Sequence, residues 1–86
     1  MPNLSSFYGI KIRMYYNDHN PPHFHAKYGE NEACIEIATG RVTEGALPRR
    51  ALSHVVEWLD LHRAAIEENW EKARRHEPLD LIEPLT

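Results

Sequence analysis

The chain has 86 residues, 42% of them hydrophobic, which predicts one small domain with a single modest core. Cys34 is its only cysteine, so an intrachain disulfide is excluded. No apolar run approaches the roughly 20 residues of a membrane span, and the first residues lack the pattern of a signal peptide. These features predict a cytoplasmic protein that does not enter a membrane. Because so short a chain often gains stability by association, a homodimer is left open.

The net charge of −3 conceals an uneven distribution. Residues 1–29 carry three bases against one acid, whereas the rest of the chain carries seven bases against twelve acids. The three bases are Lys11, Arg13 and Lys27. The N-terminal third is therefore compatible with a local anion or RNA site. The whole chain lacks the strongly basic profile of a dedicated nucleic-acid binder.

Alternation of apolar and polar side chains predicts an antiparallel meander of three to four strands over residues 7–45. In the first strand, every second residue from Ile10 to Tyr16 shares an apolar face. Further strands are expected at residues 23–28, 32–38 and 41–44. We expect the last two to be joined by a two-residue hairpin at Thr39-Gly40.

A helical part is expected over residues 48–76, where apolar side chains recur at helical spacing and Pro48 suits the first turn. A straight helix of this length would span about 40 Å. A bend near His62-Arg63, giving two helices, therefore stands as an equal alternative to one rod. In this interpretation Trp58 lies off the main apolar stripe and indicates a second contact surface.

Residues 77–86 are predicted to form an extended tail that lies on the body or on a partner. The whole chain, residues 1–86, is then a single domain of the α+β class. The C-terminal helix, or bent helix pair, covers one face of the antiparallel sheet and leaves the other open.

The open face is predicted to carry the functional residues. His23, His25 and Lys27 alternate onto one side of their strand, directly after a stiff double proline. The preceding strand adds its own outward residues to this face, Lys11, Arg13 and Tyr15. Bases, imidazoles and an aromatic ring together favour a surface for a phosphate-bearing ligand. A register slip of one residue would scatter the set.

Three interpretations of the histidine cluster compete. The first is a divalent transition metal, because His19, His23 and His25, with Asp18, offer ligands that zinc, nickel or iron accept. The second is metal-free acid–base chemistry on a phosphodiester by His23 and His25, which requires no cofactor. The third is structural, with the histidines fixing the turn or serving a protein-binding surface.

In the acid–base interpretation the neighbouring side chains also have roles. Arg13 and Lys27 stabilise the charge that develops on the phosphate, and Lys11 lies on the same face. Tyr15 stacks a base, as aromatic residues do in single-stranded RNA recognition. Cys34 is given no reactive role, because the sequence shows no base beside it.

Several phrases spread over nearly the whole chain carry a family resemblance. They are Ile12-Arg13-Met14-Tyr15, Asn17-Asp18-His19, Pro22-His23-Phe24-His25-Ala26, Leu47-Pro48-Arg49-Arg50-Ala51-Leu52, Glu57-Trp58-Leu59 and Glu68-Asn69-Trp70. These phrases resemble a small bacterial family known as domain of unknown function four-one-six-zero. Genes of that family often lie beside another small gene, and the pair is regarded as a toxin–antitoxin module. The resemblance implies a toxin-side protein that its neighbour neutralises, but it supplies no catalytic mechanism.

The leading hypothesis is therefore a toxin-side component that acts on RNA through the open face, as a ribonuclease-like phosphodiesterase. Its expected partners are a cognate small antitoxin protein and RNA. The alternative is a non-catalytic module that binds a metal or a protein.

Overall fold

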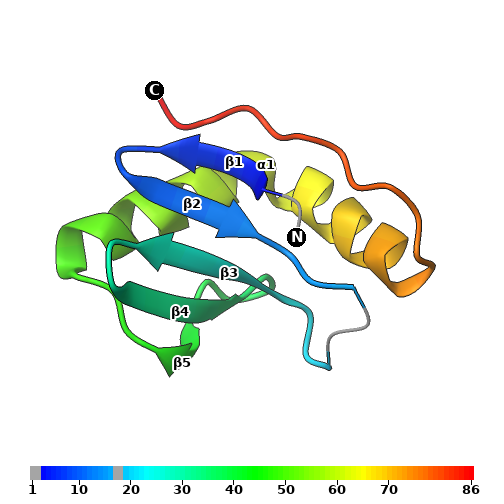
Figure 1. Cartoon of the computed structure of the whole chain (residues 1–86), viewed down its shortest axis with the longest axis horizontal. Coiled ribbons are helices and arrows are strands. Elements are labelled where there is room, and N and C mark those ends of the chain that lie inside the picture. Colours follow the sequence, from blue (N-terminus) through cyan, green and yellow to red (C-terminus); the bar gives the residue numbers. More distant parts are fainter. Residues whose placement is uncertain (1–2, 17–18) are drawn as a thin grey trace.

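The computed structural model describes residues 3–16 and 19–86, and it has an α+β architecture in which one long helix lies behind an antiparallel sheet (Figure 1). The elements in chain order are β1 Asn3–Phe7, β2 Ile10–Arg13, β3 His23–Tyr28, β4 Asn31–Glu36, β5 Val42–Gly45 and α1 Arg49–Arg74. The strands also follow one another in this order across the sheet, each antiparallel to its neighbours. Among the described helical residues, no segment has both the length and the apolar character needed to cross a membrane.

The sheet has five strands, where the sequence predicts three to four. The additional strand is β1, which pairs with β2 at one edge. Tyr8 and Gly9 connect the two strands with φ of 50° and 79°, the backbone conformation of a type I′ hairpin turn. The prediction is also wrong about the end of the first strand, because β2 stops at Arg13 and Tyr16 is 40% exposed rather than inward.

The connection from β4 to β5 is longer than the expected two-residue hairpin. The backbone N–H of Glu36 donates to the carbonyl of Arg41 at 2.9 Å, and the N–H of Gly40 donates to the carbonyl of Glu36 at 2.8 Å. Gly45 ends β5 with φ of 75°, and a Cβ there would lie 2.1 Å from the carbonyl oxygen of Glu32. Only glycine therefore allows β5 to run this close to β4.

Helix α1 packs its apolar side on the covered face of the sheet, and the two elements share one core. The backbone at His62 is non-helical, with φ of −126° and ψ of 21°, so the helix bends there as one of the two predicted alternatives requires. Next to the bend, Nε of Arg63 donates to the carbonyl of Ile37 at 3.0 Å and ties the helix to the sheet. Trp58 is fully buried in the core, so the expectation of a second contact surface around it is wrong.

The C-terminal tail returns along α1 and ends beside β1 (Figure 1). The N–H of Ile82 donates to the carbonyl of Leu4 at 2.8 Å, and the indole N–H of Trp58 donates to the carbonyl of Glu83 at 2.8 Å. The tail therefore lies on the body, which is one of the two places expected for it. Because it occupies the β1 edge and the helix, the opposite face of the sheet stays open.

Asn69 holds the tail through both ends of its side-chain amide. Its Nδ2 donates to the carbonyl of Asp80 and its Oδ1 accepts from the N–H of Asp80, each at 2.9 Å, while Asn69 itself is 1% exposed. Asn69→Ala removes both bonds and is expected to lower the free energy of unfolding by roughly 1–3 kcal/mol. Urea denaturation followed by circular dichroism measures the loss. The exposed neighbour Glu68 provides the control Glu68→Ala, and equal losses in both variants would contradict this account.

Candidate functional site

The open face of the sheet brings most of the predicted site residues together. In the strand register, Arg13 pairs with His25, His25 pairs with Cys34, and Cys34 pairs with Glu44. Directly opposed residues of antiparallel strands point to the same side of the sheet, so these four side chains form one row across β2, β3, β4 and β5. This row, Arg13–His25–Cys34–Glu44, is called the central row.

A second row lies one pair of residues along the strands. Lys11 of β2 is directly opposite Lys27 of β3, which in turn is opposite Glu32 of β4. With Glu36 and Glu44 also on this face, the cations lie over β2 and β3 and the carboxylates lie over β4 and β5. The open face is thus divided by charge, with His25 at the boundary.

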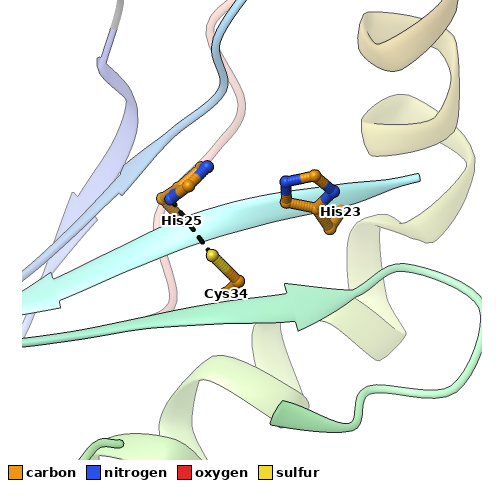
Figure 2. Close-up of side chains that lie close together, drawn as sticks. All are labelled: His23, His25 and Cys34. Atoms are coloured by element: carbon orange, nitrogen blue, oxygen red, sulfur yellow. Dashed lines mark hydrogen bonds between the residues drawn. The ribbon is translucent and has the colours of Figure 1, made fainter. Parts of the chain in front are cut away.

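His25 contacts side chains of β4 and of the segment that follows β2 on the open face. Its Nδ1 lies 3.4 Å from Sγ of Cys34 (Figure 2). The same atom lies 3.5 Å from Oε2 of Glu32, and the side chain of His25 is 14% exposed. The ring of Tyr15 packs edge-on against the imidazole, with 4.2 Å between ring centroids. Tyr15 therefore lies on the open face, as predicted, and its ring holds the imidazole of His25 in place.

His23 is less accessible than the sequence predicts. It is 3% exposed, because its ring lies between that of His25 and that of Trp70, with centroid separations of 5.2 and 5.4 Å. Its Nδ1 lies 2.8 Å from the carbonyl oxygen of Pro21. A carbonyl can only accept, so Nδ1 carries the proton and donates it. The expectation that both histidines open to solvent therefore holds for His25 alone.

The loop residues contribute unequally. His19 is exposed; its ring lies 5.0 Å from that of His23, and its Nε2 lies 4.0 Å from Oε2 of Glu44. The metal alternative also invoked Asp18, which lies outside the described residues. His19 is thus near the cluster but on its solvent side.

Cys34 is the site residue that sequence reasoning missed. With His23 and His25 it forms a group whose potential ligand atoms all lie within 4.8 Å of one another, in the part of the chain that the structure describes. Figure 2 shows the two imidazoles on β3 and the thiol on β4 turned toward one space. The signal that could have found it is the position of Cys34 opposite His25, but this requires the strand register and not only the alternation within each strand.

A comparison with family models matches residues 9–71 to the family described as Domain of unknown function (DUF4160). The match spans most of the chain. The chain belongs to this family. Its model covers β2 to β5 and most of α1, and therefore every described residue of the open face on β2, β3 and β4. No curated protein and no solved structure matches the chain.

The two histidines of β3 are expected to differ in their effect on stability. His23→Ala empties a buried space beside Trp70 and is predicted to lower the free energy of unfolding by about 1–3 kcal/mol. His25→Ala removes a more exposed ring and is predicted to cost less, about 0.5–1.5 kcal/mol. Urea denaturation of the two variants measures both losses in the free energy of unfolding and shows which is larger. His54→Ala, on the helix, is the control. A larger loss for His25→Ala would contradict the assignment of His23 as the buried partner.

Proposed function

We propose that this chain is the toxin-side component of a bacterial toxin–antitoxin pair and that it acts in the cytoplasm on RNA through its open face. The observation that supports an RNA-like ligand most directly is the pairing of Lys11 with Lys27 beside His25. Like charges directly opposed on neighbouring strands destabilise a sheet. A phosphate bound between the two lysines would neutralise this repulsion. Glu32 is opposite Lys27 on the side away from Lys11, so it compensates the charge of Lys27 but does not lie between the two lysines.

The backbone of a single RNA strand would follow β2 and β3, where the cations lie, and avoid the carboxylates of β4 and β5. Arg13 is in position to contact a second phosphate, because it stands opposite His25 two residues along β2 from Lys11. Its Nε donates to Oδ1 of Asn3 at 2.9 Å, which orients the guanidinium on the face. Lys11, Arg13 and Lys27 are thus the anion clamp of the proposal.

Proton transfer in this proposal belongs to His25, the accessible member of the predicted acid–base pair. It would take the proton of a ribose hydroxyl and return it to the leaving oxygen, as in a ribonuclease-like phosphodiesterase. Glu32, with Oε2 3.5 Å from Nδ1, is in position to hold the orientation of the ring during the transfer. His23 holds the ring of His25 from behind, and Tyr15 holds it from the side.

The antitoxin partner of the proposal rests on the family resemblance. The division of the open face into cations and carboxylates suits a protein that presents both charges in complementary positions. Such a partner would cover His25 and the lysines together, which would block RNA directly.

Induced expression in a bacterial host tests this function. The native chain is expected to stop growth and co-expression of the neighbouring gene to restore it, whereas His25→Ala is expected to be harmless although folded. His54→Ala, which changes a histidine away from the open face, is the matched control and is expected to stay toxic. Sequencing of cellular RNA ends then locates cleavage. A native chain without effect on growth, or an equally toxic His25→Ala variant, would rule the proposal out.

Binding of a labelled single-stranded RNA of mixed sequence at several salt concentrations tests the anion clamp separately. The double variant Lys11→Ala/Lys27→Ala is expected to bind more weakly. For each phosphate contact removed, the slope of log affinity against log salt should fall by about 0.7. Arg74→Ala, on the exposed end of the helix, keeps the native slope if binding is local to the face. An unchanged slope in the double variant would place the ligand elsewhere.

The alternative, a non-catalytic metal- or protein-binding module, is supported by the burial of His23 and by the approach of Cys34 to His25. It predicts a growth assay in which no version of the chain has an effect.

A further inference from the structure

His23, His25 and Cys34 place three donor side chains around one point at the end of the sheet (Figure 2). The arrangement follows from two simple features of the backbone. Residues two apart on β3 face the same side, and the register sets Cys34 of β4 directly opposite His25. None of the three donors depends on a long loop for its position, since all lie on paired strands.

The contacts of His25 distinguish this cluster from a catalytic thiol pair. In a triad, the nucleophile and the orienting carboxylate contact opposite nitrogens of the imidazole. Here Sγ of Cys34 and Oε2 of Glu32 approach the same atom, Nδ1, at 3.4 and 3.5 Å. With Nδ1 itself, these two atoms make three potential ligand atoms that lie close together at one side of the ring, which is an arrangement that a bound cation would fit.

The distances fit a tetrahedral ion after a small adjustment. With Zn–N of about 2.05 Å and Zn–S of about 2.3 Å, tetrahedral angles place N and S about 3.6 Å apart and two N atoms about 3.4 Å apart. The separation of Nδ1 of His25 from Sγ of Cys34 is 3.4 Å, and none among the three donors exceeds 4.8 Å. Side-chain movements of about 1.2–1.4 Å therefore suffice to close the set.

His23 is already oriented for ligation by its second nitrogen. Because Nδ1–H donates to the carbonyl of Pro21 at 2.8 Å, the lone pair of the neutral ring is on Nε2. A backbone carbonyl that accepts from the non-ligating nitrogen is the usual support of a metal-bound histidine. The packing of Trp70 against the ring limits its rotation further.

We propose that His23 through Nε2, His25 through Nδ1 and Cys34 through its thiolate bind one Zn²⁺ ion. Imidazole and thiolate are both preferred ligands of zinc, whereas Mg²⁺ and Ca²⁺ select oxygen. Three protein ligands leave a fourth position, which Glu32 is near enough to share with water. The inference does not rest on the proposed function, because the zinc site is argued from the two histidines and the cysteine and not from the lysines that would bind RNA.

Binding has a defined proton balance. Zn²⁺ accepts electron pairs from two neutral imidazoles and from the Cys34 thiolate, and the thiol proton leaves to solvent. One proton is therefore released per ion when the imidazoles begin neutral, and affinity falls as the pH falls because protons compete with the ion for the ligand atoms. Calorimetric titrations of zinc in buffers of different ionisation enthalpy measure this proton directly.

Cobalt(II) replaces zinc in such sites and reports its ligands by absorbance. Tag-free, reduced and chelator-treated protein is expected to bind one Co²⁺ per chain, with a thiolate-to-cobalt charge-transfer band in the near ultraviolet and d–d bands of a four-coordinate ion. Cys34→Ser, which changes little but the sulfur, is expected to lose the charge-transfer band. His25→Ala is expected to lose more affinity than the roughly 10–100-fold typical of a lost supporting contact. His54→Ala is the histidine control and keeps native binding.

A native protein without the charge-transfer band at saturating Co²⁺ would overturn the proposal. So would a folded His25→Ala variant with native affinity and spectrum. Circular dichroism of each variant separates lost ligation from lost folding, and Cys34→Ser keeps the test valid if the histidine variant does not fold. Metal binding and RNA binding are measured independently. A cobalt spectrum with the charge-transfer band but no RNA binding supports this inference and contradicts the proposed function. RNA binding without that band supports the proposed function and contradicts this inference.

Discussion

The register between β3 and β4 is the constraint on which the rest of the site depends. It sets His25 opposite Cys34, Lys27 opposite Glu32 and His23 opposite Glu36 in one antiparallel pairing. A shift of one residue would turn each side chain of β4 to the other face, so Cys34 would enter the core and Ile35 would leave it. Burial of Phe24, Ala26 and Ile35 under α1 prevents that shift, because each is 0% exposed. The hydrophobic core thus fixes the chemistry of the opposite face.

Much of this architecture could be predicted, because its signals are local. Alternation within β2 and β3 assigns their two faces correctly, and the apolar repeat locates the helix. Its bend at His62 is one of the two alternatives that the length of the helical segment left open. β1 escaped prediction because its residues Asn3–Phe7 include two adjacent serines and have no strict alternation; the strand depends on pairing with β2. Trp58 was misassigned although it lies three residues after Val55, a spacing that puts both on one helix face.

The site could be predicted only as far as one strand determines it. His23 and His25 share a face by alternation alone, and the prediction that groups them with Lys27 needs nothing more. Cys34 enters through a pairing between strands, and a single strand does not reveal which residue lies opposite. The burial of His23 depends on Trp70, which is remote in sequence and approaches through the packing of the bent helix. Long-range contacts of this kind leave no pattern near the residue that they bury.

The two chemistries proposed for this face compete for one imidazole ring. With Nδ1 bound to zinc, the neutral ring of His25 carries its proton on Nε2 and has no lone pair left to accept another, so a bound ion removes the general base that a metal-free phosphodiesterase needs. Lys11 and Lys27 are not ligands, and they keep their charge in either state. A dication beside them would add positive charge to the same face and strengthen the attraction for phosphate. Zinc would therefore increase anion affinity while it suppresses proton transfer by His25. Any reaction of the zinc-bound protein would have to use water at the fourth coordination position instead.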